Sequence, residues 1–294
     1  MSNLFLKIKN KLQRKFEKSQ RYYNIDGFDM DLGEDHTLPL IQKYNLMYDR
    51  FVPYLASLVK SENEWIIDIG ANVGDTTAAM IKHTKAKILC VEPTAKFYEL
   101  LKKNVNNFGD EFSQRIKIIN AYIALKSDNK YTSVVVGGTA IMREDANSEI
   151  GSYTLPDLLK KENIDISKIA LIKTDTDGYD SDCIMSLGKA LLKINPVLYW
   201  ENQIDTDEQY VKFLNMADYL NNCDYSNFFV FDNYGNYLCK TDYNGLKEMC
   251  GYINRIRKAK TTYTFRYMDV LACRDNKVLI CKNAINKYLN VYGE

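Results

Sequence analysis

"IIDIGANVGD", residues 66–75, is the stretch that decides the fold. An apolar run reaches Asp68, and two glycines, Gly70 and Gly74, then follow with Asn72 between them. This pattern predicts a buried strand that ends in a sharp turn, where glycines let a ligand approach the backbone closely. The next segment, "DTTAAMIKHT", predicts a helix whose free N–H groups and positive dipole end face the turn. We therefore expect a ligand-binding corner between this strand and this helix.

Short apolar runs continue to alternate with helical segments along the chain. The runs that predict strands are residues 65–70, 86–93, 115–125, 169–175 and 196–202. Strands that alternate with helices form a parallel sheet with helices on both faces. Residues 225–240 predict two antiparallel strands around a tight turn, and residues 263–273 predict a last strand. The fold class is therefore α/β, with a doubly wound and mostly parallel sheet.

Composition sets the broad class. The chain has 294 residues, of which 46% are hydrophobic and 26% charged, and its formal net charge is +1. These values fit a globular protein with one large α/β domain and extensions, or with two small domains, and predict no nucleic-acid partner. No apolar run reaches the roughly 18 residues that span a bilayer, and the N-terminus lacks a signal-peptide core. Seven cysteines without a CxxC pair indicate reduced thiols, so we expect a cytoplasmic protein.

The N-terminus carries a local excess of positive charge. Residues 1–21 contain seven bases and one acid, and apolar residues recur among them at helical spacing. We predict a basic amphipathic helix at 3–20 within an N-terminal helical extension at 1–60, followed by the sheet domain at 61–294. Such a helix can bind a partner or the anionic inner face of a membrane. Alternatively, it packs on its own domain or is exchanged between the subunits of an oligomer.

Three ligands are compared for the turn at 70–74. A phosphate-binding P-loop needs a lysine after the second glycine, and none follows Gly74. A dinucleotide site needs GxGxxG, but Asn72 and Asp75 stand at the second and third glycine positions. S-adenosylmethionine has no phosphate, and its cationic sulfonium and ammonium groups suit the carboxylates of Asp68 and Asp75. Glu92, at the end of the next strand, is placed to accept both ribose hydroxyls, as in NAD enzymes.

Five ordered motifs, "IIDIGANVGDTT", "CVEPTAKFYELLKKNV", "IALKSD", "YTLPDLL" and "LIKTDTDGYD", give the chain a family resemblance. Together they resemble the FkbM family of class I methyltransferases over about residues 65–202. The resemblance implies a Rossmann-like, seven-stranded sheet with an antiparallel last strand, S-adenosylmethionine as methyl donor and usually a hydroxyl as acceptor. The family commonly reads K-I-D-V-E-G-[FA]-E where this chain has "KTDTDGYD", so Asp177 and Asp180 replace two glutamates.

The predicted donor site follows from the corner and from this resemblance. It comprises Asp68, Gly70, Ala71, Asn72, Gly74, Asp75, Thr76, Glu92, Pro93, Ala124 and Asp175. Glu92 is predicted to hold the ribose. The adenine is predicted to reach the end of the third strand, within residues 120–124.

Acidic side chains crowd the ends of two neighbouring strands. The cluster comprises Lys173, Asp175, Asp177 and Asp180 on one strand end, and Glu201 and Asn202 on the next. Asp175, Glu201 and Asn202 offer hard oxygen ligands for Mg²⁺, an arrangement that resembles the metal site of catechol O-methyltransferases. Without a metal, Asp175 or Asp177 accepts the hydroxyl proton directly, or the acids cap a helix and pair with Lys173. His36, in an acidic bend, is a further candidate base.

The sequence as a whole predicts an S-adenosylmethionine-dependent O-methyltransferase that acts on a sugar hydroxyl of a glycan or its precursor in polysaccharide biosynthesis. Four aromatic residues predicted near the cleft, Tyr179, Tyr199, Trp200 and Tyr234, suit a sugar ring. Two alternatives are a nicotinamide-dependent oxidoreductase and a catalytically silent binding protein on a methyltransferase fold.

Overall fold

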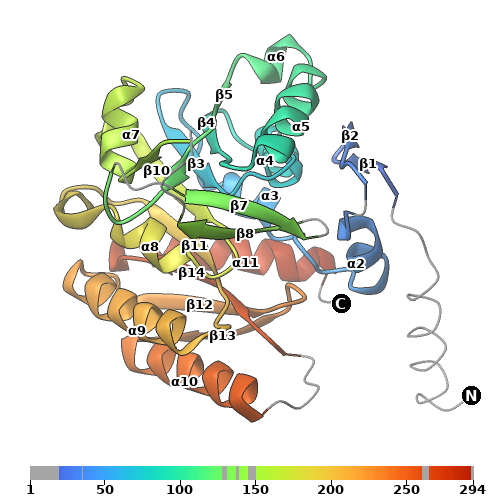
Figure 1. Cartoon of the computed structure of the whole chain (residues 1–294). Helices are drawn as coiled ribbons and strands as arrows, with labels where there is room; N and C mark the ends of the chain where they lie inside the picture. Colours follow the sequence, from blue (N-terminus) through green and yellow to red (C-terminus); the bar gives the residue numbers. More distant parts are fainter. Residues whose placement is uncertain are drawn as a thin grey trace, which may run out of the picture.

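A computed structural model describes residues 20–34, 36–127, 131–136, 139–144, 150–259 and 265–292. A central sheet with helices on both faces dominates the molecule (Figure 1). Within the described residues this sheet has eight strands in the order β13-β12-β14-β11-β10-β3-β4-β5. In chain order these strands are β3 (Trp65–Ile69), β4 (Lys87–Val91), β5 (Ile116–Ile119), β10 (Ile169–Thr174), β11 (Val197–Asn202), β12 (Asn227–Asp232), β13 (Tyr237–Thr241) and β14 (Met268–Cys273).

The direction of the strands confirms the predicted α/β class. Strands β5, β4, β3, β10 and β11 are parallel, and β14 inserts antiparallel between β11 and β12. The sheet has one strand more than the seven that the family resemblance implies, because β13 pairs antiparallel with β12 at the sheet edge. The chain reverses its spatial order between β3 and β10. Ligands of doubly wound sheets bind beside such a reversal, at the carboxyl ends of the strands.

Each face of the sheet is covered by its own set of helices. The first set is α3 (Val52–Ala56), α4 (Asp75–Ile81), α5 (Ala95–Asn106) and α11 (Val278–Tyr292); the second is α7 (Leu155–Lys161), α8 (Asp180–Met185), α9 (Asp207–Asn222) and α10 (Tyr243–Ala259). Side chains alternate between the faces, so Ile66 packs under the first set and Ile67 under the second. The short elements are α6 (Asp110–Ser113) and three 3-10 turns, η1 (Ile166–Lys168), η2 (Gly188–Leu192) and η3 (Asp275–Lys277).

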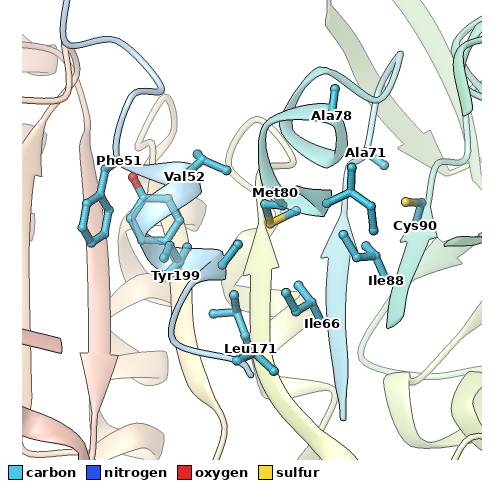
Figure 2. Packing of buried hydrophobic residues seen from close by; sticks show 14 of the residues in the cluster. Phe51, Val52, Ile66, Ala71, Ala78, Met80, Ile88, Cys90, Leu171 and Tyr199 are labelled. Carbon is cyan, nitrogen blue, oxygen red and sulfur yellow. The ribbon is translucent and has the colours of Figure 1, made fainter. Parts of the chain in front are cut away.

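The described part of the N-terminal extension packs into the first core. Phe51, just before α3, stacks with Phe231 at 4.6 Å between ring centres and lies 6.0 Å from the ring of Tyr199 (Figure 2). Helix α2 (Leu38–Tyr44) precedes it. Both α2 and α3 carry a proline in their first turn, so Pro39 and Pro53 lie at the starts of two separate helices.

The extension is not wholly helical. Strands β1 (Tyr22–Ile25) and β2 (Phe28–Asp31) form an antiparallel hairpin around Asp26 and Gly27, which both have positive φ. An Asp-Gly pair between alternating apolar residues is a strong hairpin signal, so this part of the predicted helical extension is a hairpin. The predicted basic helix at 3–20 lies, apart from Gln20, outside the described part of the chain.

The predicted strand at 115–125 is divided in two. After β5, Asn120 donates its side-chain amide to the carbonyls of Glu92 and Pro93, at 2.8 and 3.0 Å. The chain then leaves the main sheet, and β6 (Tyr122–Ile123) pairs with β9 (Ser152–Tyr153). A further hairpin is formed by β7 (Tyr131–Val136) and β8 (Thr139–Glu144). None of the described helices has both the length and the apolar character needed to cross a membrane.

Candidate active site

The corner after β3 lies against the corner after β10. Gly70 has φ +76, and a Cβ on it would overlap the backbone carbonyl oxygen of Asp175. The amide of Asp175 donates to the carbonyl of Ile69 at 3.0 Å, and the amide of Gly70 donates to the carbonyl of Val91 at 2.9 Å. The two turns therefore form one continuous backbone surface across the carboxyl ends of β4, β3 and β10.

Two cavities lie over this surface. The first, here called the Glu92 cavity, measures about 70 Å³ and is bounded by Glu92, Pro93, Thr94, Phe97, Ala121, Tyr122, Ile123 and Tyr179. The second, the acidic cavity, measures about 340 Å³, and its titratable wall comprises His36, Tyr48, Asp49, Asp75, Lys173, Asp175, Asp177, Glu201 and Tyr267. Gly70, Asn72, Asp175 and Asp177 line both. An elongated ligand can therefore extend from one cavity into the other.

Glu92 is fixed at the wall of the first cavity. Its Oε2 accepts a hydrogen bond from the amide of Asn72 at 2.9 Å, and its Oε1 accepts one from the amide of Thr94 at 2.7 Å. The side chain is only 4% exposed. Burial raises the pKa of Glu92 to about 7, although the hydrogen bonds from Thr94 and Asn72 act to lower it.

A buried ion pair supports the corner from below. Asp68 is fully buried, and its Oδ2 accepts hydrogen bonds from the hydroxyls of Thr76 at 3.0 Å and Thr77 at 2.8 Å. The Nζ of Lys173, its neighbour across the sheet, lies 3.2 Å from Asp68 Oδ1 and 3.5 Å from Asp175 Oδ2. Burial acts to lower the pKa of Lys173, but Asp68, Asp175 and Asp75 outweigh it and raise that pKa. Lys173 therefore stays protonated and serves as an anchor, not as a base.

Carboxylic acids dominate the acidic cavity. Burial, with Asp75 and Asp175 nearby, raises the pKa of Asp49 to about 8. Burial also raises the pKa of Asp75, against the influence of His36 and Lys173. The ring Nδ1 of His36 accepts a hydrogen bond from the amide of Leu38 at 3.3 Å, which holds the imidazole in the cavity wall.

Glu201 lies directly opposite Asp269 in the antiparallel pair of β11 and β14, so the two side chains point to the same face. Burial and nearby acids raise the pKa of both well above the ordinary range. The acidic cavity therefore combines neutral carboxyl groups with the ion-paired Asp175.

Residues 68–226, just over half of the chain, match the family model described as the methyltransferase FkbM domain. The chain belongs to the FkbM methyltransferase family. No curated protein matches it.

Solved structures similar to this FkbM-family chain share little sequence with it. Methyltransferase FkbM from Methylobacillus flagellatus KT is 14% identical, with a TM-score of 0.38 over 80% of this chain and 58% of that one. A SAM-dependent O-methyltransferase from Thermotoga maritima is 13% identical, with a TM-score of 0.42 over 90% and 81%. A putative O-methyltransferase from Klebsiella pneumoniae is 11% identical, with a TM-score of 0.44 over 91% and 96%. The family assignment rests on the family model and not on these structures.

Most of the predicted site residues of this FkbM methyltransferase line the two cavities. They are His36, Gly70, Asn72, Asp75, Thr76, Glu92, Pro93, Lys173, Asp175, Asp177 and Glu201. Four predicted donor contacts do not line either cavity: Asp68, Ala71, Gly74 and Ala124. Asp68 and Ala71 are buried beneath the turn, a Cβ on Gly74 would meet Leu101 of α5, and Ala121, Tyr122 and Ile123 line the wall in place of Ala124.

The predicted metal set is not brought together. Adjacent residues of a strand point to opposite faces, so Asn202 points away from Glu201 and Asp175. Its amide oxygen accepts from the indole N–H of Trp200 at 3.3 Å, and its side chain contacts Cys250 at 3.7 Å. Among the described residues, no three His, Cys, Asp or Glu side chains are grouped so that they could hold a metal ion. Asn202 is a core residue, and we derive no step through Mg²⁺.

The acids of the loop after β10 have two different roles: Asp180 stabilises the loop, and Asp177 lines the cavities. Asp180 is fully buried and accepts hydrogen bonds from the hydroxyls of Thr174 at 2.6 Å and Thr176 at 3.0 Å, so it holds the loop in shape. Burial raises the pKa of Asp180 to about 7. Asp177, with φ 51, lines both cavities instead.

Two of the aromatic residues predicted at the cleft, Tyr199 and Trp200, are core residues on opposite faces of β11. Tyr179 lines the Glu92 cavity. Tyr48 and Tyr267 line the acidic cavity in their place, together with Asp49, and none of these three residues was predicted from the sequence. Asp49 has φ 59, which is uncommon outside glycine, and no motif in the sequence marks it.

Proposed function

We propose that this FkbM-family chain is an S-adenosylmethionine-dependent O-methyltransferase that methylates a sugar hydroxyl of a glycan or glycan precursor. The observation that carries the proposal is the continuity of the Glu92 cavity with the acidic cavity across Gly70 and Asp175. One end offers a carboxylate among apolar walls, and the other offers several acids. This polarity fits a donor with a neutral nucleoside at one end and cationic groups at the other.

The residues present fit the donor in detail. Glu92 would accept the ribose hydroxyls, and the apolar walls formed by Pro93, Phe97 and Ile123 would hold the adenine. Asp75 and Asp175 would attract the ammonium and sulfonium groups from the acidic side. The backbones of Gly70 and Asp175 are in contact, and both residues line the two cavities, so the donor would lie across this contact.

The donor supplies an electrophilic methyl group, and the chain must remove the proton of the acceptor hydroxyl. Asp49 is our preferred base, because a carboxyl with a pKa of about 8 is well matched to a hydroxyl near neutral pH. Asp175 and Asp177 remain the predicted alternatives on the opposite wall, and His36 is a further one. Lys173 would keep Asp175 in place through their contact at 3.5 Å.

The acceptor class rests on the character of the acidic cavity. Tyr48 and Tyr267 offer aromatic faces for a sugar ring, and the neutral and ionised carboxyl groups offer hydrogen bonds to its hydroxyls. Seven free cysteines favour a reducing compartment, so a cytoplasmic reaction is part of the proposal. Contact of the basic residues 1–21 with the inner membrane face, or with another subunit, stays a prediction.

Calorimetry tests the donor site. We expect S-adenosylhomocysteine to bind with a micromolar dissociation constant and NAD to show no binding under the same conditions. Binding of NAD alone would favour the oxidoreductase and overturn the proposal. Transfer of label from S-adenosylmethionine to a glycan extract tests the acceptor class, and donor binding without any transfer would favour a silent binding protein.

A further inference from the structure

A third cavity opens beside the acidic one, on the side of the N-terminal extension. This outer cavity measures about 370 Å³. Hairpin β1–β2, α2, α3, α4 and α11 all contribute to its wall. The C-terminal end of α11 lies close to α2 there, as Figure 1 shows. Most of its wall comes from residues 25–57 and α11, outside the family-matched segment 68–226.

The outer cavity shares its inner end with the acidic cavity. Leu38, Asp49, Asp75 and Thr76 line both. An acceptor whose hydroxyl lies in the acidic cavity can therefore extend past these four residues into the outer one. The position of the wall outside the matched segment suits a role in recognising the particular acceptor of this chain, since acceptors differ among enzymes that share one donor.

Acidic and basic side chains lie at different ends of the path from the acidic cavity to the outer cavity. The inner end carries the acids Asp49 and Asp75, and the outer wall carries Arg50 and Lys287. Asp26 is also on the outer wall, but it is already engaged by His83, whose Nε2 lies 2.9 Å from its carboxylate. The Arg50 and Lys287 side chains make no ion pair or hydrogen bond with any residue in the described part of the chain.

Arg50 acts on Asp49 through its charge, but it forms no close ion pair with that carboxyl. Two cations that make no ion pair or hydrogen bond with the described residues at the wall of one cavity indicate an anionic ligand. Arg50 presents a planar set of donors that matches the oxygens of a phosphate, and Lys287 adds a mobile point charge from α11. A phosphate ester carries up to two negative charges, which balance the two cations. A carboxylate would balance only one of them.

We propose that the outer cavity binds a phosphate group of the acceptor through Arg50 and Lys287, while a hydroxyl of the same molecule reaches the acidic cavity. The acceptor class is then a phosphorylated sugar or a sugar diphosphate ester. This inference rests on the proposed methyl transfer, because it assigns the rest of the molecule whose hydroxyl is methylated. No covalent step occurs in the outer cavity.

Calorimetry on the full chain, saturated with S-adenosylhomocysteine, tests the inference with inorganic pyrophosphate as the probe. We expect pyrophosphate to bind the native chain and Arg50→Gln and Lys287→Gln each to weaken it about fivefold or more. Lys282→Gln is the matched control, because Lys282 is an exposed lysine on the same helix that does not line the cavity. Acetate at equal ionic strength is the control ligand for a single carboxylate.

The outcomes separate the two proposals. Three results would overturn the phosphate site while S-adenosylhomocysteine still binds. Pyrophosphate does not bind the native chain, or it binds Lys287→Gln and Lys282→Gln with equal affinity, or acetate binds as tightly as pyrophosphate. Loss of S-adenosylhomocysteine binding by the native chain would instead overturn the proposed function. The affinity of each variant for S-adenosylhomocysteine reports whether it is folded.

Discussion

The backbone of Asp175 occupies the space that a side chain on Gly70 would take. A Cβ on Gly70 would overlap the carbonyl oxygen of Asp175, and the amide of Asp175 is bonded to Ile69, the residue before that glycine. The turn after β3 and the turn after β10 therefore fix each other's positions. Both cavities of the candidate active site are built on this contact.

Gly70→Ala should separate the two turns. The left-handed φ of +76 alone costs about 1–2 kcal/mol for a side chain, and the overlap with Asp175 adds to that cost. We expect a lower melting temperature and loss of S-adenosylhomocysteine binding. Gly188→Ala is the control, because Gly188 has φ +51 but nothing within 4 Å of the added Cβ. Equal effects of both variants on the melting temperature and on binding would show that the contact with Asp175 is not what matters.

Glu92 should decide donor affinity. Charge-assisted hydrogen bonds contribute about 1.5–3 kcal/mol each, so Glu92→Ala should weaken S-adenosylhomocysteine binding at least about tenfold. In the native chain affinity should also fall as pH drops below about 7, because Glu92 then takes up a proton and loses acceptor capacity. Glu99→Ala, on the exposed face of α5, is the control. Unchanged affinity in the Glu92 variant at pH 8 would show that the donor binds elsewhere.

Several features of the fold are local enough to be predicted from sequence. The strand, glycine turn and helix at 65–81 and the parallel order of strands follow from alternating apolar runs. The hairpin at 22–31 was equally local, since Asp26–Gly27 carries its signal. The break at Asn120 was not local, because it depends on hydrogen bonds to Glu92 and Pro93 from another strand.

Site residues, too, could be predicted where their signal is local in the sequence and not where it depends on tertiary packing. Glu92, Gly70 and Asp175 were predicted because each lies at the end of a recognisable strand. The prediction that Asn202 is a metal ligand was wrong for a reason visible in the sequence. Asn202 directly follows Glu201 on a strand, so its side chain must point to the other face. Asp49 could not be predicted, because only the packing of the N-terminal extension against β11 and β12 brings it to the cavity.

Stability should fall as pH rises. Asp49, Glu92, Asp180, Glu201 and Asp269 all have raised pKa values. Between about pH 5 and pH 8 the folded chain therefore holds protons that the unfolded chain has already released near its ordinary carboxyl pKa of about 4. The free energy of unfolding therefore decreases across that range, and we expect the melting temperature to be about 5 °C or more lower at pH 8 than at pH 5.5.

Glu201→Gln tests whether Glu201 contributes to this dependence of stability on pH. The amide imitates the protonated carboxyl opposite Asp269, so the variant should be more stable than the native chain at pH 8 and less dependent on pH. Glu248→Gln, on the exposed face of α10, should leave the slope unchanged. A native melting temperature that rises from pH 5.5 to pH 8 would contradict the raised pKa values.

A chelator should not change turnover. Asn202 is directed away from Asp175 and Glu201, so the predicted ligands cannot surround one ion. We expect the same rate of label transfer to the acceptor before and after treatment with EDTA. A loss of activity that Mg²⁺ restores would show that another arrangement of acids binds a metal.

The identity of the base can be decided by the pH dependence of the rate. A carboxylate acts as a base only after losing its proton, so with Asp49 as the base the rate should rise with pH up to about 8. Asp49→Asn should lower turnover by about 100-fold or more and remove that rise, while S-adenosylhomocysteine affinity stays within a few-fold of the native value. Asp224→Asn is the control, because Asp224 has a similar backbone, with φ 63, and is exposed outside all three cavities. If Asp175→Asn or Asp177→Asn removes the rise and Asp49→Asn does not, the base is on the β10 loop and Asp49 only shapes the cavity.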